Sequence, residues 1–298
     1  MQRVCGSAGP DLRHTRWSGH LEGADPEYLR ELVGYWAETF DWRGEERRLN
    51  AFPHFRSVVD GLRLHYVHQK ADAGGLPLLA ASAGHGGASA DAFDVVVGSL
   101  PGFGFSEAPA TPGTTEMRMA HLFHELMTRV LGYERYAVRG SDFGASVAEA
   151  LAMLHPRTVA IQATKPQTLA TSLNDSPAGL ASWIVEKFRR WSDCDGDVER
   201  RFTKDQLLTN ISVYWFTQTI GPSMRLYGES DYRQDAEWDV PTAHLMSSKD
   251  MFPTPREWIE RFSRIDRWTA VGRGGHFLEW EEPRLVAEDM RAFFRALR

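Results

Sequence analysis

The stretch GSDFGAS, residues 140–146, constrains the fold of this chain more than any other segment. The preceding RYAVRG predicts a strand, and the following GASVAEALAML predicts a helix. A strand that turns into a helix over so few residues requires small side chains at the turn, and Gly140 and Gly144 meet that requirement. The turn points its central side chain outward, and that side chain is Asp142.

Strands and helices alternate on both sides of this turn. LPLLA and FDVVVG predict buried strands before it, and MRMAHLFHELMTRVLG predicts a helix. After it, VPTAHLM and RWTAVG predict strands, and EEPRLVAEDMRAFFRAL predicts an amphipathic helix. This order is typical of an α/β fold, in which helices flank a mostly parallel sheet.

Two local signals precede the alternating region. From Tyr28, YLRELVGYWAETF predicts a helix, and Asp25-Pro26 marks its start. FRSVVDGLRLHYVH predicts two strands joined at Asp60-Gly61, because Asp-Gly is a strong signal for a tight hairpin turn.

Later in the chain, the aromatic and mainly helical stretch from about Gln162 to Tyr232 interrupts the alternation, which indicates an inserted cap. We therefore divide the chain into an N-terminal arm at residues 1–55, a first part of the core at 56–160, a helical cap at 161–236 and a second part of the core at 237–298.

Composition argues against several kinds of partner. The net charge of −6 disfavours nucleic acid, because phosphate binding requires a clustered basic face. No stretch approaches the roughly 20 apolar residues of a membrane span, and the first residues lack the apolar core of a signal peptide. We expect a cytoplasmic protein with no membrane partner. Cys5 and Cys194 have no metal-ligand spacing and are expected to be free thiols.

Asp142 is the candidate nucleophile. The N-terminus of the helix that follows favours an ionised carboxylate, and an ionised carboxylate can attack an electrophilic carbon. The alternative is that Asp142 only caps the helix, since aspartate is common before a helix. The paired glycines and the preceding strand favour the catalytic role.

The ester formed by such a nucleophile must be hydrolysed, which requires a water molecule and a general base. His276, in VGRGGHFLEW, is the best candidate, because it follows a strand and two glycines. Asp250 lies just past a predicted strand and can orient this histidine, and the order nucleophile, acid, histidine is that of α/β-hydrolases. Asp239, Glu279 and Glu281 are rival acids.

Neither a metal nor a cofactor is expected. HLFH places His121 and His124 on one helix face, but no further ligand is evident. LPGFGFS contains Gly102 and Gly104, but it has Glu107 where a dinucleotide fingerprint requires a third glycine. A tight loop after a strand explains this segment better.

Several longer motifs of the chain resemble the microsomal-type epoxide hydrolases, which are α/β-hydrolases with a characteristic N-terminal region. The similarity includes GSDFGAS and RGGHF, and it extends through most of the chain in the segments YLRELVGYWAETFDWRGEERRLNAFPHFRSVVDGLRLHYVH, DAFDVVVGSLPGFGFSEAP, IQATKPQTLATSLNDSPAGLASWIVEKFRRW, DQLLTNISVYWFT and EEPRLVAEDMRAFF.

The resemblance implies an α/β-hydrolase fold with a helical cap and an N-terminal wrapping segment. It implies that Asp142 opens an epoxide to give an alkyl-enzyme ester, and that His276 with Asp250 activates the water that releases a vicinal diol. Tyr227, in MRLYGES, matches one of two cap tyrosines that bind the epoxide oxygen, and the backbone N–H of Phe143 matches an oxyanion donor. The implied partner is a small apolar epoxide, as in xenobiotic detoxification, and we leave a homodimer open.

The chain departs from the family pattern at three places. The mildest is Phe143, which replaces the usual tryptophan after the nucleophile but keeps the backbone N–H. The other two departures indicate internal deletions. After LPLLA it lacks the oxyanion loop and the helix that follows, and AASAGHGGASADAFD, with His85-Gly86-Gly87, leads almost directly into the next strand. LHPRTVAIQATKP, from Leu154, joins the helix after Asp142 directly to the cap, where the family has a further strand and cap helices, and Thr158 falls near the position of the second tyrosine. A lost oxyanion donor costs about 10² to 10³ in rate.

These departures leave two alternatives to a working epoxide hydrolase. One is a catalytically impaired or non-enzymatic family member. The other is a haloalkane dehalogenase-like hydrolase, which shares the aspartate chemistry but holds a halide with tryptophans or an asparagine. Trp36, Trp183 and Trp215 are expected to serve in helix packing instead.

Overall fold

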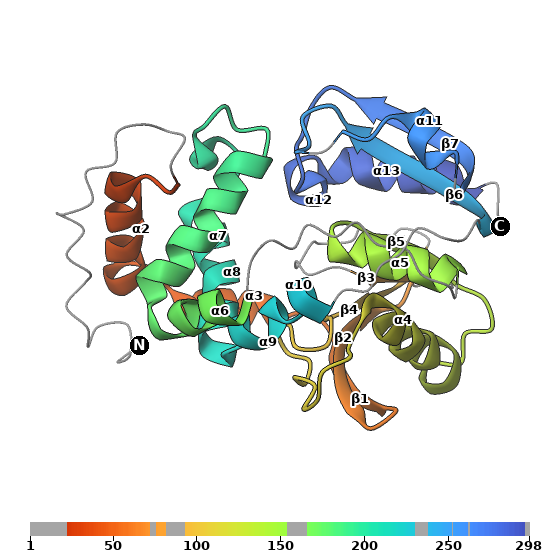
Figure 1. The fold of residues 1–298 in the computed structure, drawn as a ribbon, viewed down its shortest axis with the longest axis horizontal. Helices are drawn as coiled ribbons and strands as arrows, with labels where there is room; N and C mark the ends of the chain where they lie inside the picture. Colours follow the sequence, from red (N-terminus) through yellow and green to blue (C-terminus); the bar gives the residue numbers. More distant parts are fainter. Residues whose placement is uncertain are drawn as a thin grey trace.

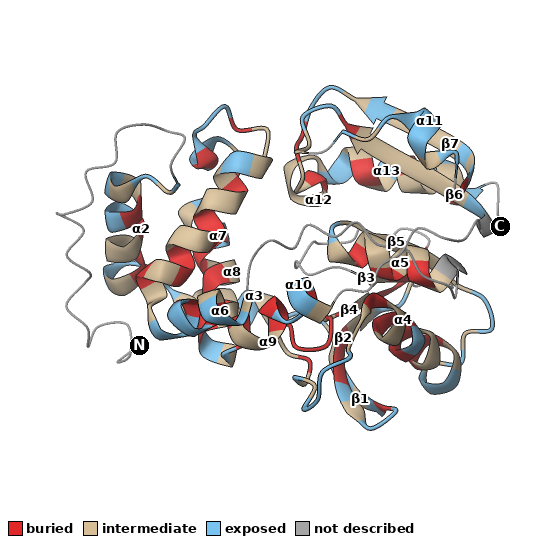
Figure 2. Ribbon diagram, in the orientation of Figure 1, coloured by how far each residue is buried: buried red, intermediate tan, exposed pale blue. Residues whose placement is uncertain are grey.

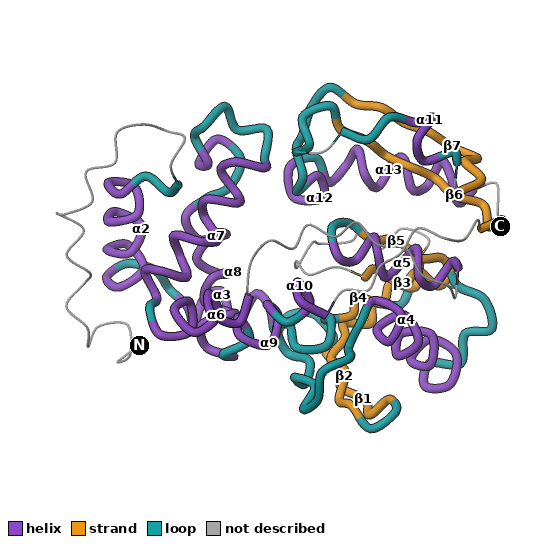
Figure 3. The backbone as a smooth tube through the Cα atoms, viewed as in Figure 1, coloured by secondary structure: helices purple, strands orange, loops and turns teal. Residues whose placement is uncertain are grey.

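The structure is a computed structural model of the chain. It describes residues 23–71, 76–81, 93–153, 166–229, 238–251, 253–261 and 263–295. Helices gather on one side of the molecule and strands on the other, with further helices beside each sheet (Figures 1 and 3). Residues 1–22, His85 to Gly87 and Thr158, which the sequence singles out, lie outside the described residues.

A five-stranded sheet forms the larger part of the core, in the order β1-β2-β4-β3-β5. The outer pairs β1–β2 and β2–β4 are antiparallel, whereas β4–β3 and β3–β5 are parallel. The strands are β1 (His54–Val59), β2 (Leu62–Gln69), β3 (Leu76–Ala81), β4 (Phe93–Gly98) and β5 (Ala137–Gly140). The predicted hairpin is confirmed, and both turn residues, Asp60 and Gly61, have the positive φ that a two-residue turn of this kind requires.

Two helices cover one face of this sheet. They are α4 (Glu116–Glu125), which continues into the π-helical turn η2 (Leu126–Val130), and α5 (Phe143–Met153). Their buried side chains, with Phe123 at 0% exposure, pack on Leu79 and Val96 of the sheet. A Cβ on Gly98 would overlap the Phe123 ring, so this strand position must stay small.

A second, two-stranded sheet is separate from the first in the described part of the chain. It consists of the parallel strands β6 (Trp238–Ser247) and β7 (Ser263–Val271) and is accompanied by α11 (Arg256–Ile259), α12 (Leu278–Glu281) and α13 (Pro283–Phe294). Phe294 attaches α13 to the larger sheet by an edge-to-face contact with Phe93, with ring centroids 5.9 Å apart.

A cavity of about 630 Å³ separates the two sheets. Its walls are β5 and α5 on one side and β6 and α13 on the other. This is where a sheet of the expected family would contain a further strand, so the cavity agrees with the deletion inferred after Leu154. The predicted strands are therefore present, but the described residues do not join them into one continuous sheet.

The helical segment that the sequence predicts to be a cap, called the cap below, forms a layer against which the N-terminal helices pack. It contains α6 (Pro166–Asp175), α7 (Pro177–Trp191), η3 (Val198–Arg200), α8 (Lys204–Thr217), α9 (Ile220–Met224) and α10 (Leu226–Glu229), against which α2 (Pro26–Glu38) and α3 (Trp42–Leu49) pack. Buried residues follow the facing sides of α2, α7 and α8 (Figure 2). Asp25 caps α2 as predicted, and Thr203 with Gln206 forms a capping box on α8.

Within the described ranges, no helix combines the length and the apolar character needed to cross a membrane. Cys194 is buried with a free thiol, whereas Cys5 falls in the first 22 residues, outside the described part.

Candidate active site

The predicted strand–turn–helix around Asp142 is present. β5 ends at Gly140, Asp142 adopts a φ of 53°, and α5 begins at Phe143. A positive φ at a residue other than glycine is strained, and it is typical of a nucleophile held at such a turn. A Cβ on Gly140 would overlap the carbonyl group of Gly144, which explains why the turn requires a glycine there.

The turn also fixes one oxygen of the Asp142 carboxylate. The Phe143 N–H donates to Asp142 Oδ1 at 2.6 Å. The Ala145 N–H donates to the Asp142 carbonyl oxygen at 2.9 Å, which closes the first turn of α5. The first N–H group of α5 therefore points at the Asp142 carboxylate.

His276 lies between two carboxylates. Its Nε2 is 2.8 Å from Asp142 Oδ2, and its Nδ1 is 3.1 Å from Asp250 Oδ1. Asp142 belongs to the larger sheet, whereas Asp250 and His276 follow β6 and β7 of the smaller sheet. Three residues that the sequence predicts separately therefore form one hydrogen-bonded chain.

The rival acids have other partners. Glu279 pairs with Arg139, which lies on β5 just before the nucleophile turn. Glu281 accepts a hydrogen bond from the Asp193 N–H at 2.8 Å. The side chain of Asp239 is not among those described. Asp250 is therefore the acid in contact with His276.

The two carboxylates change the charge state of His276. Burial by itself would lower the pKa of this imidazole, but hydrogen bonds and charges from Asp142 and Asp250 raise it from 6.5 to about 10. At neutral pH the resting site therefore contains a protonated imidazole between two carboxylates.

A cavity of about 260 Å³ opens above Asp142 and His276. Most of its lining from the cap is apolar or aromatic, contributed by Trp183, Ile184, Phe188, Trp191, Ile220 and Met224. Trp36 and Trp215 pack in the core as predicted, but the expectation for Trp183 is incomplete, because this side chain also lines the cavity. The cavity suits a small apolar ligand.

Two tyrosines of the cap reach the same cavity. Tyr227, on α10, packs edge-to-face on Phe143 with ring centroids 4.9 Å apart. Tyr214 lies on α8, and burial together with the Asp142 charge raises its pKa to about 12. Burial and the charges of Asp142 and Tyr214 also raise the pKa of Tyr227. Within the described residues, neither hydroxyl group forms a hydrogen bond to the protein, so both remain available to a ligand.

Sequence reasoning missed Tyr214. It occurs in ISVYWFT, where most positions are apolar or aromatic, so no local pattern distinguishes it from a core residue. Asn210, one helical turn earlier on α8, also lines the cavity, and its Oδ1 is buried without a partner in the described part of the chain.

No group of acidic, histidine or cysteine side chains among the described residues could hold a metal. His124, one of the two histidines on the helix face singled out in the sequence, contacts the Tyr136 hydroxyl at 2.9 Å.

Comparison with known proteins identifies two family matches. Residues 7–86 match the family described as epoxide hydrolase N terminus, and residues 61–289 match the alpha/beta hydrolase family. A protein of Stigmatella aurantiaca is 34% identical over 347 aligned positions, covering 95% of this chain and 78% of the relative. Epoxide hydrolase 1 of Sus scrofa is 29% identical over 369 positions, covering 92% of this chain and 81% of that protein.

Both alignments are longer than the 298 residues of this chain. They therefore contain positions of the relatives that have no counterpart here, in agreement with the inferred deletions. Among solved structures, juvenile hormone epoxide hydrolase from the silkworm Bombyx mori superposes with a TM-score of 0.87 at 31% identity. That match covers 100% of this chain and 90% of the silkworm chain.

Proposed function

This chain belongs to the epoxide hydrolases, within the α/β-hydrolase family, and we propose that it converts a small apolar epoxide to a vicinal diol through an ester on Asp142. The observation that carries the proposal is the hydrogen-bonded chain Asp142–His276–Asp250 beside an apolar cavity that is also lined by Tyr214 and Tyr227. No cofactor is required for this chemistry.

In the first step, a carboxylate oxygen of Asp142 attacks one epoxide carbon, and the bond between that carbon and the ring oxygen breaks. The electron pair moves to the ring oxygen, which accepts hydrogen bonds from Tyr227 and Tyr214. Both phenols have raised pKa values, so they remain protonated donors at neutral pH. The alkoxide formed in this way is a strong base and takes its proton from the His276 imidazolium or from water, so ester formation does not require His276.

Formation of the ester then prepares His276 for the second step. Esterification removes the negative charge of Asp142, which is one of the two charges that raise the His276 pKa. The pKa falls, and the neutral imidazole can accept a proton from water. Asp250 remains at 3.1 Å to orient the ring and to stabilise its charged form.

In the second step, water gives a proton to His276, and its oxygen adds to the Asp142 carbonyl carbon. The Phe143 N–H, which already binds Oδ1, stabilises the negative charge that develops on that oxygen. The bond between the carbonyl carbon and the alkyl oxygen breaks, and the leaving alkoxide takes the remaining proton of the added water. This transfer releases the diol and restores the Asp142 carboxylate, with His276 again protonated. The diol oxygen at the attacked carbon therefore comes from Asp142.

Styrene oxide tests this mechanism. The wild type is expected to release phenylethanediol, whereas Asp142→Ala is not. Asp195→Asn, on an exposed loop of the cap, is the matched control that should keep wild-type turnover. In His276→Ala, mass spectrometry should detect one substrate bound to the peptide that contains Asp142. Absence of both diol and ester would overturn the proposal.

A family member with strongly reduced turnover is the second candidate, and the split sheet is the observation that favours it. Ester formation without measurable diol release from the wild type would support this alternative. The dehalogenase alternative shares the nucleophile, and Trp183, Trp191 and Asn210 line the cavity. Halide release from 1-bromobutane without diol formation from styrene oxide would favour it.

A further inference from the structure

The loop that carries His276 has little intrinsic rigidity. It follows β7 as Gly272-Arg273-Gly274-Gly275, and Gly274 has a φ of +73°. Glycines give a chain many accessible conformations, so such a loop does not hold a side chain in place without external contacts. The geometry of the His276 imidazole must therefore depend on the residues against which this loop packs.

The end of cap helix α7 provides these contacts. The His276 N–H donates to the Trp191 carbonyl oxygen at 2.8 Å, and the Trp191 and His276 rings meet edge-to-face with centroids 5.3 Å apart. A Cβ on Gly275 would overlap the backbone of residues 191–193, so the two chain segments lie in direct backbone contact. The loop is therefore docked on the cap and not on the sheet alone.

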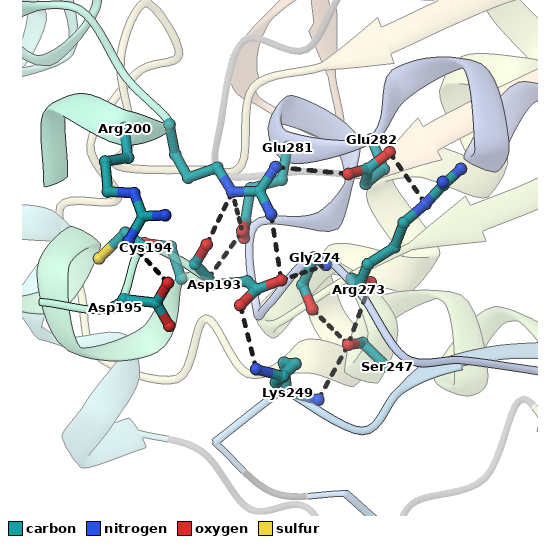
Figure 4. Close-up of polar contacts among 12 residues, drawn as sticks. Asp193, Cys194, Asp195, Arg200, Ser247, Lys249, Arg273, Gly274, Glu281 and Glu282 are labelled. Atoms are coloured by element: carbon teal, nitrogen blue, oxygen red, sulfur yellow. Dashed lines mark hydrogen bonds and ion pairs between the residues drawn. The ribbon is translucent and has the colours of Figure 1, made fainter. Parts of the chain in front are cut away.

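Asp193 lies at the centre of this contact, between the segments that carry the acid and the base (Figure 4). Its Oδ2 accepts the Gly274 N–H at 3.1 Å, two residues before His276. Its Oδ1 is 3.4 Å from Lys249 Nζ, and Lys249 directly precedes Asp250. One carboxylate of the cap thus contacts the neighbours of both catalytic partners.

Charged residues hold Asp193 itself in place. Arg201, after η3, donates to Asp193 Oδ2 at 3.0 Å and to its carbonyl oxygen at 2.7 Å, and it also contacts Glu282 at 3.4 Å. The Asp193 N–H donates to Glu281, on α12 just after His276. The Asp193 side chain is only 13% exposed. Burial would raise its pKa, but the Gly274 N–H, Lys249 and Arg201 together hold the pKa below its usual range.

Resting on the proposed function, we infer that Asp193 is a positioning residue, which aligns His276 and Asp250 for hydrolysis of the ester by fixing their loops to the cap. The attack by Asp142 does not require the imidazole to be aligned with water, whereas the second step does. Loss of Asp193 should therefore slow ester hydrolysis much more than ester formation.

The test compares Asp193→Asn with Asp195→Asn. The first substitution keeps the side-chain shape but removes the charge that pairs with Arg201 and Lys249. Asp195 lies two residues away, is 64% exposed and pairs with Arg200 only at the surface, so it is a matched control. Asp195 has a φ of 50°, a conformation that asparagine tolerates well.

In single-turnover experiments with styrene oxide, Asp193→Asn should form the ester at nearly the wild-type rate and hydrolyse it about 10²-fold more slowly, because small misplacements of a catalytic group have effects of this size. The ester should accumulate, and Asp195→Asn should match the wild type. Equal slowing of both steps, or no slowing of either, would overturn the inference. A wild type that forms no ester would instead contradict the proposed function.

A second measurement does not depend on turnover. Asp193 contacts the Gly274 N–H and Lys249, whereas the largest upward contributions to the His276 pKa come from Asp142 and Asp250, so the pKa depends on how the ring is placed between those two carboxylates. NMR titration of the His276 imidazole should give a pKa near 10 in the wild type and in Asp195→Asn, and a value closer to 6.5 in Asp193→Asn. An unchanged pKa in Asp193→Asn would overturn the inference.

Discussion

The cap and the sheet layer of this molecule differ in how completely they are packed. The helices of the cap enclose a continuous cluster in which Leu32, Leu180, Leu207 and Leu208 are fully buried. In the part of the chain that the structure describes, the sheet layer consists of two separate sheets with a cavity of about 630 Å³ between them. Helix formation depends on local contacts, whereas a sheet needs every strand as a partner for the next. A deletion of one strand therefore affects the two layers very differently.

The proposed catalytic residues lie on both sides of this division. Asp142 belongs to the larger sheet, and Asp250 and His276 belong to the smaller one. Backbone pairing does not join the two sheets in the described part of the chain, so other contacts must keep the nucleophile and the base together. These contacts are the cap segment around Asp193, the Arg139–Glu279 ion pair and the packing of α13.

The largest expected difference between the two layers is in the free energy of unfolding that is lost when a leucine is replaced by alanine. Leu208→Ala in the cap should lower the free energy of unfolding by about 2–5 kcal/mol, because it opens a cavity in a closely packed cluster. Leu245→Ala on β6, beside the existing cavity, should cost about 1 kcal/mol or less. Urea denaturation measures the free energy of unfolding of both variants. Equal losses of this free energy would show that the sheet layer is as well packed as the cap.

The contribution of the cap to chemistry is tested at Tyr214. Tyr214→Phe removes one donor to the developing alkoxide, and we expect ester formation to slow by about 10²-fold. Rapid quench and mass spectrometry in a His276→Ala background measure this step without hydrolysis. Tyr35→Phe removes a hydroxyl that binds Asp205 on the far side of the cap and should not change the rate. An unchanged rate in Tyr214→Phe would leave Tyr227 as the sole cap donor.

The contact between the two sheets should depend on pH. The folded state raises the pKa of His276 from 6.5 to about 10, so its stabilising contribution is fully present below pH 6.5 and is lost as the pH rises toward 10. Asp142→Asn removes one partner and tolerates the positive φ. The stability difference between wild type and variant should decline by about 1–3 kcal/mol from pH 6.5 to 10. A stability difference that stays constant over this pH range would contradict a protonated His276 paired with Asp142.

The smallest expected change in stability concerns His244, which faces the cavity between the two sheets from β6. Its Nε2 is buried without a partner among the described residues, and burial lowers its pKa to about 4. His244→Leu should stabilise the protein by about 1 kcal/mol, because it removes an unsatisfied polar group. It should also reduce the stability lost between pH 6.5 and 4, where the unfolded state binds the proton. The exposed His121→Leu is the control, with little expected change.

Much of the site could be predicted because its signals are local. Gly140 and Gly144 specify the tight turn at Asp142, and Asp60-Gly61 specifies the hairpin. The chain order of Asp142, Asp250 and His276 indicated which residues would meet. Tyr214 and Asp193 could not be found in this way, because each acts through residues distant in sequence and occurs in a segment with an ordinary helical or loop pattern.

The sequence by itself determined the elements of this protein, its nucleophile turn and its family, because hydrophobic period, glycine placement and motif order are properties of the chain. Only the tertiary structure decided that the sheet is divided among the described residues, that Glu279 pairs with Arg139, and that Asp193 contacts the loop of His276. These features depend on distances between segments that lie far apart in the chain, and such distances follow from packing and not from local propensity.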